Sequence, residues 1–330
     1  MAPDKVKVLY IAGNGRSGST LLGVLLGQVP GYFNVGEVRR VFDTYLSDRD
    51  AALGSEPVCS CDAPFRKCPA WTSIFREAFG GLDAVDRTAL SASSWKFSMH
   101  KRLFAPTMRE VAFPWERDEL DALLGALDRL YRAIPRATDS RVVVDASKWP
   151  MYGAMVSMLP SVEMYVLHLV RDPRAVVHSF TRTKIRPGEM HIPPQGALLT
   201  TGYWVAVNPA VERFWRAGTN PRYMRMTYES FVREPRASLE RILEFVGAPG
   251  VLPMRGDRTV MVDATHSVAG NESRAARGEV TLRLDDEWRR KLPMHRRRMV
   301  EMLTWPMLVK YGYEGRAARR QGETTELAST

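Results

Sequence analysis

IAGNGRSGST, residues 11–20, lies between a short apolar run and a longer helical one, and this order decides the fold. The preceding run, KVKVLYIA at residues 5–12, is rich in β-branched residues and predicts a buried strand. The following run, STLLGVLLGQV at residues 19–29, carries enough apolar residues to cover a broad helical face. A strand, a glycine-rich turn and a helix in this order open a parallel-sheet α/β domain.

The turn nearly matches the phosphate-binding loop of nucleotide-binding proteins, which reads glycine, four residues, glycine, lysine and then serine or threonine. Gly13, Gly18 and Thr20 satisfy this spacing. Ser19, however, stands at the lysine position, and the cation inside the turn is Arg16. Without that lysine, the terminal phosphates of a triphosphate would lose their main cation. Arg16 can still bind an anion through two parallel N–H donors. The turn therefore favours a single phosphate that carries another anionic group.

Further apolar runs predict strands, and segments of helical character separate them. The predicted strands are 141–147, 164–172 and 222–230, and the predicted helices are 115–133, 151–158, 173–183, 203–216, 236–246 and 286–303. The first two of these strands are continuous in apolar residues, as expected where helices cover both faces of a sheet. The alternation predicts a three-layer α/β/α fold with a central, mostly parallel sheet, similar to the phosphate-loop NTPases.

We expect one domain over residues 1–313. Residues 47–114, which carry three cysteines and scattered aromatic side chains, are interpreted as an insertion that shapes a binding pocket. The loops 184–200 and 264–282 are long and rich in polar residues, glycine or proline, and loops of this length are often functional. Residues 314–330 are expected to form a flexible basic tail.

The composition limits the class of protein. With 45% hydrophobic and 25% charged residues, the chain is typical of a soluble globular protein. It contains no apolar run of eighteen residues, so no membrane span is expected. The apolar segment before Gly13 predicts a strand rather than a secretion signal, and three cysteines within ten residues do not suit a secreted disulfide framework, so a cytoplasmic location is expected.

The net charge of +10 favours acidic partners in general. A solvated helix face and a disordered tail are the favoured explanation of this charge, and contact with an anionic membrane surface stays open. Because no nucleic-acid module with interleaved aromatic residues is evident, nucleic acid is not an expected partner.

A second motif is LVRDPRAVVHSFTRTK, residues 169–184. Asp172 suits a helix cap and Pro173 suits the first helical turn, so Arg171 closes the preceding strand. Arg171 would then lie at the carboxyl edge of the sheet, where open α/β sheets bind ligands. Ser179 follows eight residues later.

Together the two motifs resemble the sulfotransferases that use 3′-phosphoadenosine 5′-phosphosulfate (PAPS). That family has a loop of the form Lys/Arg-Ser-Gly-Ser/Thr-Thr for the 5′-phosphosulfate and an Arg…Ser pair, eight apart, for the 3′-phosphate. The matching residues are Arg16, Ser17, Gly18, Ser19 and Thr20 in the loop, and Arg171 and Ser179 in the pair. The resemblance implies PAPS as co-substrate. Sulfonate carries less charge than a phosphoryl group, so no metal is expected to be required.

The resemblance also implies a catalytic base. One branch of the family uses a histidine in a Lys-x-His arrangement, but here Pro150 follows Lys148 and Trp149. A second branch, which includes tyrosylprotein and some glycan sulfotransferases, uses a glutamate after the first helix, and Glu37 resembles it. A base among cations would have a lowered pKa. The alternative is a surface carboxylate that pairs with one of the arginines at 39 and 40.

The resemblance assigns Lys148 to the bridging oxygen of the leaving group and Arg16 to the same developing charge. It also implies that Tyr228 lies near the adenine, although a core tyrosine explains this residue equally. Residues 264–282 resemble the family's loop over the 3′-phosphate, which makes Gly270, Asn271 and Arg274 further candidates; a mobile surface loop is the alternative.

Cys59, Cys61 and Cys68 offer three thiolates to a zinc ion, but no fourth ligand at suitable spacing is evident unless Asp62 or a distant histidine serves. Related bacterial sulfotransferases carry a similar Cys-Pro-x-Trp segment. We therefore interpret this region as a structural part of the insertion, without a metal.

The sequence thus predicts an enzyme that moves a sulfonate from PAPS to a hydroxyl acceptor by in-line displacement. The acceptor would be a small molecule, a glycan or a glycolipid. Two alternatives stay open. One is a phosphate-loop kinase or NTPase that uses ATP and magnesium, with Asp145 ending a Walker-B-like strand. The other is a basic protein that binds nucleotides or polyanions without turnover.

Overall fold

The computed structural model describes residues 5–46, 57–98, 114–181, 195–216 and 221–314. Outside these ranges lie all of the predicted 314–330 tail except Glu314, much of the 184–200 loop and parts of the 47–114 insertion.

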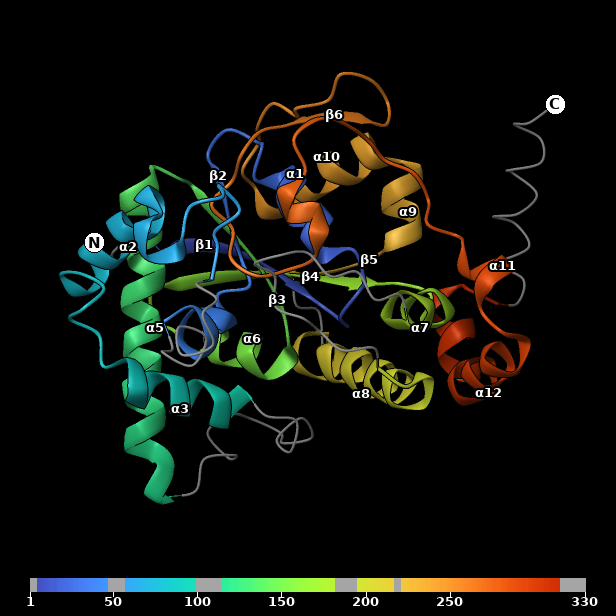
Figure 1. The fold of residues 1–330 in the computed structure, drawn as a ribbon, viewed down its shortest axis with the longest axis horizontal. Helices are drawn as coiled ribbons and strands as arrows, with labels where there is room; N and C mark the ends of the chain where they lie inside the picture. The colour runs from blue at the N-terminus through green and yellow to red at the C-terminus, as the bar shows by residue number, and fades with distance from the viewer. Residues whose placement is uncertain (1–4, 47–56, 99–113, 182–194, 217–220, 315–330) are drawn as a thin grey trace.

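A five-stranded parallel sheet forms the centre of the molecule, in the order β2-β3-β1-β4-β5 (Figure 1). The strands are β1 (Val6–Ala12), β2 (Tyr32–Gly36), β3 (Val142–Lys148), β4 (Val162–Val170) and β5 (Tyr223–Thr227). This confirms the predicted central parallel sheet. The edge strand β2 was not predicted, because five residues that include Asn34 and Gly36 give little strand signal.

Helices cover both faces of the sheet, as the alternation of side chains along β1 requires. Val8, Tyr10 and Ala12 pack on the face covered by α5 (Arg117–Thr138), α6 (Pro150–Ser157) and α8 (Ala197–Trp215). Leu9 and Ile11 pack on the face covered by α1 (Ser19–Leu26), α9 (Tyr228–Arg233) and α10 (Pro235–Val246). The three-layer α/β/α class is therefore confirmed (Figure 1).

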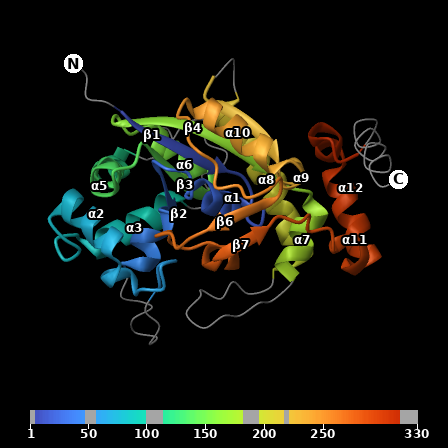
Figure 2. The same ribbon diagram turned by 90° about the horizontal axis from the view of Figure 1, so that it is seen from above.

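The described part of the insertion belongs to the same core. Trp71 and Phe75 of its helix α2 (Pro69–Phe79) are fully buried in the cluster that also contains Tyr131 of α5. The remaining described elements are η1 (Val41–Tyr45), η3 (Phe65–Lys67), α3 (Arg87–Ser98), η5 (Pro114–Glu116), α7 (Pro173–Thr181), β6 (Thr259–Val262), η6 (Glu272–Ala275), β7 (Gly278–Thr281), α11 (Trp288–Lys291) and α12 (Met294–Tyr311). The antiparallel strand pair β6–β7, which was not predicted, lies beside α1 (Figure 2).

Two predicted elements were wrong in their bounds for a local reason. The strand predicted over 222–230 ends at Thr227, because the Thr227 hydroxyl accepts a hydrogen bond from the Ser230 N–H (3.1 Å) and caps α9. The helix predicted over 286–303 is two helices, since Pro293 lies between α11 and α12 and starts the second.

Other helices extend beyond their predicted bounds. α8 begins at Ala197 rather than at residue 203, and α5 continues through Pro135 to Thr138. Throughout the described ranges, each helix is too short or too polar to span a bilayer.

Candidate active site

The glycine-rich turn after β1 needs glycine at two positions. Gly13 has φ 144°, and a Cβ there would lie 2.5 Å from the Leu169 carbonyl oxygen of β4. Gly18 has φ 92°, and its Cβ would lie 2.4 Å from the Tyr228 ring. Any side chain at either position would push the turn away from the sheet. The turn therefore stays close to the sheet edge and leads into α1 at Ser19, whose first N–H groups have no partner within the helix.

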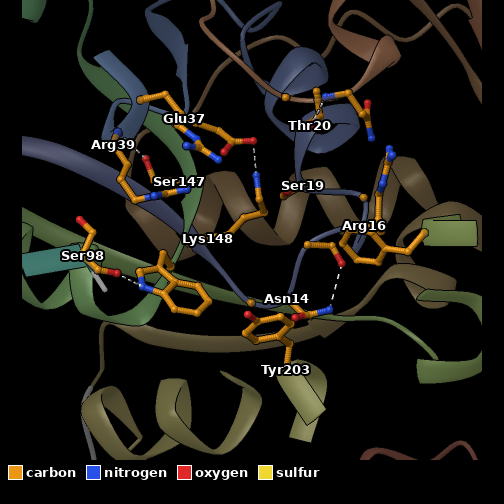
Figure 3. Close-up of a pocket in the computed structure, with 18 of the residues that line it drawn as sticks. Asn14, Arg16, Ser19, Thr20, Glu37, Arg39, Ser98, Ser147, Lys148 and Tyr203 are labelled. Carbon is orange, nitrogen blue, oxygen red and sulfur yellow. Dashed lines mark hydrogen bonds and ion pairs between the residues drawn. The ribbon is translucent and has the colours of Figure 1, made fainter. Parts of the chain in front are cut away.

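A cavity of about 300 Å³ opens between this turn and the carboxyl ends of β2 and β3. It brings together most of the predicted catalytic and loop residues, including Arg16, Glu37 and Lys148 (Figure 3). The other polar or glycine residues of its wall are Gly13, Asn14, Gly15, Gly18, Ser19, Thr20, Arg39, Arg40, Ser98, Ser147, Gln195, Thr200, Gly270 and Asn271.

Glu37 and Lys148 form a hydrogen-bonded ion pair inside this cavity, and Figure 3 shows the two side chains directed at each other. Their side chains are only 13% and 15% exposed. Lys148, the last residue of β3, also donates to the Ala146 carbonyl (3.1 Å). Arg39 and Arg40, the alternative partners of Glu37, instead lie 3.9 and 3.7 Å from the carboxylate of Asp43.

The electrostatics of the pair follow from burial among cations. Burial raises the pKa of the Glu37 carboxyl, but the charge and hydrogen bond of Lys148, with the charges of Arg39 and Arg40, outweigh it and hold the pKa below its usual value. Burial also lowers the pKa of the Lys148 ammonium, and the attraction of Glu37 offsets this only in part. The carboxylate is therefore ionised, as a proton acceptor must be.

Asp145, the residue that supported an NTPase, lies outside the walls of this cavity. Its carboxylate is completely buried and accepts hydrogen bonds from the Tyr131 hydroxyl and from the Ser147 N–H (2.8 Å) and hydroxyl (2.5 Å). Burial raises the pKa of Asp145 to about 6. The Ser147 hydroxyl in turn accepts from the Arg39 N–H (3.2 Å). Asp145 thus braces the turn after β3 rather than facing a ligand.

A second cavity, of about 240 Å³, lies on the other side of the turn and contains the predicted 3′-phosphate residues Arg171 and Ser179. The Arg171 guanidinium lies 4.4 Å from the centre of the Tyr228 ring and donates to the Arg16 carbonyl (3.0 Å) and to Asp285 Oδ2 (3.0 Å). Arg16, Gly18 and Asn271 line both cavities, which are therefore adjacent. Leu21, Glu272, Ser273 and Asp285 complete the wall of the second.

The 264–282 loop covers the start of α1. The Asn271 N–H donates to the Thr20 hydroxyl (3.3 Å), and a Cβ on Gly270 would lie 2.9 Å from the Thr20 side chain. Arg274, however, lines neither cavity, because its guanidinium donates to the Val58 carbonyl (2.9 Å). Ser17 is buried beneath the turn, 1% exposed, and lines neither cavity.

A buried atom of the second cavity, Arg171 Nε, indicates an anionic ligand there. It has no hydrogen-bond partner among the described residues, and since buried polar atoms in folded proteins are nearly always hydrogen-bonded, a phosphate in this cavity would complete it. Ser17 Oγ also has no partner among the described residues, but it lies beneath the turn. The donors present, hydroxyl, guanidinium and backbone N–H, are those that hold phosphates in proteins.

Sequence reasoning expected aromatic residues of the insertion, such as Trp95, at the pocket, but it missed the other aromatic residues of the first cavity. Trp95 of α3, Trp149, Phe180 of α7 and Tyr203 of α8 line it. The Trp149 indole donates to the Ser98 carbonyl (2.6 Å), which holds the insertion against the end of β3 (Figure 3). The position of Trp149 directly after Lys148 was a usable signal. Nothing in the sequence singled out Tyr203.

Comparison with known proteins agrees with this geometry. The sequence model described as the sulfotransferase family matches residues 9–251. Carbohydrate sulfotransferase 6 of Homo sapiens and carbohydrate sulfotransferase 5 of Mus musculus are each 27% identical to the chain, over 47% of its length and 42% of their own. The chain thus matches less than half the length of these relatives. The sulfotransferase domain of the Synechococcus PCC 7002 olefin synthase superposes over 91% of this chain and 95% of that one, with 19% identity and a TM-score of 0.47. The chain belongs to the sulfotransferase family.

Proposed function

We propose that the protein transfers a sulfonate group from PAPS to a hydroxyl group of an acceptor. The observation that carries the proposal is the convergence of Arg16, Glu37 and Lys148 on one cavity. An acid, a base and an anion-binding turn within one cavity are the groups that an in-line transfer between two oxygens requires.

The two adjacent cavities suit the two ends of the donor. The turn at residues 16–20, with the start of α1, would hold the 5′-phosphosulfate, and Arg171 with Ser179 would hold the 3′-phosphate. Tyr228, which lines the second cavity, would lie beside the adenine. We do not extend the 3′-phosphate role to Arg274, because its guanidinium is bonded to Val58.

The roles of the chain's own residues follow from the ion pair. Lys148 would turn from Glu37 toward the anion at the turn, which leaves the Glu37 carboxylate free to accept the proton of the acceptor hydroxyl. The new bond joins the acceptor oxygen to sulfur, and the bond from sulfur to the bridging oxygen breaks. PAPS supplies the activated sulfonate. Lys148 and Arg16 would stabilise the negative charge that develops on the leaving phosphate.

A carbohydrate hydroxyl is the acceptor that we favour. The curated relatives are named as carbohydrate sulfotransferases, and the first cavity is walled by Trp95, Trp149 and Tyr203. Flat aromatic faces with a few convergent polar groups are typical of small-molecule sites that accept an amphipathic ligand.

An ATP-dependent reaction is disfavoured by two residues. Ser19 stands where a phosphate-loop NTPase has lysine, and Asp145 faces Tyr131 and Ser147 instead of a magnesium site.

Transfer of radiolabelled sulfonate from PAPS to a panel of sugars, phenols and steroid alcohols tests the proposal, with release of adenosine 3′,5′-bisphosphate as a second readout. Transfer to at least one sugar, lost in Glu37→Gln and retained in Glu240→Gln on the exposed face of α10, supports it. The proposal would be contradicted if protein that binds the bisphosphate released it no faster than spontaneous hydrolysis does, whichever acceptor class is added.

A further inference from the structure

Three cysteines of the insertion meet one histidine from the far end of the chain. The sulfur atoms of Cys59, Cys61 and Cys68 and a ring nitrogen of His266 all lie within 4.8 Å of one another. Cys61 Sγ lies 3.8 Å from Cys68 Sγ, and Cys68 Sγ lies 3.3 Å from His266 Nδ1. Cys59 and Cys68 are buried, at 1% and 0% exposed.

The separations of Cys68 from Cys61 and from His266 are close to the edges of a tetrahedral metal site. With Zn–S bonds of about 2.3 Å and Zn–N bonds of about 2.0 Å, a regular tetrahedron has sulfur–sulfur edges of about 3.8 Å and sulfur–nitrogen edges of about 3.5 Å. Three thiolates and one imidazole form one of the usual ligand sets of structural zinc. We propose that Cys59, Cys61, Cys68 and His266 together bind one Zn²⁺ ion.

The local structure brings all four ligands to one place in the fold. Cys59 and Cys61 flank Ser60 in a tight turn, which is closed by hydrogen bonds from the Cys59 N–H to the Ala63 carbonyl (2.9 Å) and from the Asp62 N–H to the Cys59 carbonyl (3.0 Å). Asp62 takes the left-handed conformation in this turn, with φ 67°. Cys68 directly precedes Pro69, the first residue of α2.

His266 is fixed from two sides. The Trp71 indole N–H donates to the His266 carbonyl (2.7 Å), and the imidazole stacks on the Phe33 ring with the planes 17° apart. These contacts direct Nδ1 toward Cys68. Asp62, the other fourth ligand considered from the sequence, is 85% exposed and has Arg277 as its partner, so it lies outside the cluster.

Zinc here would tie the insertion to the segment that supports the catalytic base. Two residues after His266, the Val268 N–H donates to the Val35 carbonyl (3.0 Å) and the Val268 carbonyl accepts from the Glu37 N–H (2.8 Å). The same segment then reaches Gly270 and Asn271 above Thr20. The site is therefore structural: four protein ligands leave no open position for substrate, and the ion fixes the strand end that carries Glu37.

Elemental analysis of the full-length, tag-free protein, purified without chelator, tests the site. We expect about one zinc per chain, with an X-ray absorption spectrum of about three sulfur ligands at ~2.3 Å and one nitrogen at ~2.0 Å. His266→Ala and Cys61→Ser should each lower the retained zinc at least tenfold in competition with a colorimetric chelator. His295→Ala, which changes an exposed histidine of α12, should retain it.

Three results would overturn the site. The first is that the parent protein holds no stoichiometric zinc, even after incubation with a slight excess of the ion. The second is that peptide mass mapping finds a disulfide between Cys61 and Cys68. The third is that the X-ray absorption spectrum of the zinc shows no sulfur neighbours. All three are measured on the parent protein, so they decide the matter even if a variant fails to fold, and none depends on sulfotransferase activity.

Discussion

The ammonium group of Lys148 is hydrogen-bonded to the carboxylate of Glu37 although the two residues are 111 positions apart in the chain. Each ends or follows a strand of the same parallel sheet, β3 for Lys148 and β2 for Glu37, so the carboxyl edge of the sheet brings them together. In the protein without donor, each residue neutralises the other. A pair of this kind prevents a buried, unpaired charge until a ligand replaces one partner.

Replacement of Glu37 by glutamine should abolish most of the turnover while donor binding persists. The amide keeps the shape of the side chain but does not accept a proton, and a positioned general base contributes about 10²- to 10⁴-fold to a rate. Steady-state kinetics should therefore give a kcat lower by about this factor, with Glu240→Gln as the matched control. An unchanged kcat would assign the base to another residue.

The pH dependence of kcat/KM should be bell-shaped, with a broad plateau. The base must be ionised, so activity falls only as the pH drops through the pKa of Glu37, which Lys148 holds below its usual value of 4.5. Lys148 must be protonated, so activity falls as the pH rises through its pKa, which burial holds below the usual 10.5.

Lys148→Arg provides the check on this profile. A guanidinium stays protonated at any accessible pH, so the alkaline fall should disappear in the variant while the acid side is unchanged. An alkaline fall that persists at the same pH in Lys148→Arg would mean that another group controls it.

Asp285 should weaken donor binding, because its carboxylate lies 3.0 Å from the Arg171 guanidinium that the 3′-phosphate would contact. Asp285→Asn removes the competing charge and should tighten binding of adenosine 3′,5′-bisphosphate several-fold, with little effect on AMP, which has no 3′-phosphate. Calorimetry of both ligands measures the difference. Weaker bisphosphate binding by the variant would show that Asp285 instead holds Arg171 in its binding orientation.

Gly36→Ala should destabilise the protein and disturb the base. Gly36 has φ 75°, and a Cβ there would lie 2.1 Å from the Val268 carbonyl oxygen, which is the acceptor of the Glu37 N–H. A clash with backbone is costly because no side chain can move aside, so Tm and kcat should both fall.

Gly125→Ala is the matched control. Gly125 lies inside α5 with nothing within 4 Å of its Cβ position, and alanine there should stabilise the protein by about 0.5–1 kcal/mol. Equal Tm values for the two variants would contradict the account of the contact between Gly36 and Val268.

The sequence predicted those parts of the site that depend on local order. The turn at residues 13–20 lies between a clear strand and a clear helix, and Arg171 directly follows a continuous apolar strand, so both could be assigned to the carboxyl edge of the sheet. The proximity of Glu37 and Lys148 came from the family resemblance, since β2 carries too little strand signal to place Glu37.

Contacts between distant segments were beyond sequence reasoning. The cysteines were noticed, but His266 lies 198 residues after Cys68, and only the folded chain brings them together. Asp285 and Tyr203 reach the cavities from loops and helices whose side-chain directions no local pattern predicts. Arg274 was a candidate phosphate ligand because its loop resembles the family's loop over the 3′-phosphate, whereas in the fold its guanidinium bonds to Val58. The compartment and any membrane contact stay predictions.

Calorimetric titration with adenosine 3′,5′-bisphosphate, compared with AMP and with ATP plus magnesium, tests the central claim most directly. The account predicts tight binding of the bisphosphate alone, weakened about 10- to 150-fold in Arg171→Ala through loss of a charged hydrogen bond, and unchanged in Arg241→Ala on the exposed face of α10. Binding of ATP with magnesium, without binding of the bisphosphate, would contradict it.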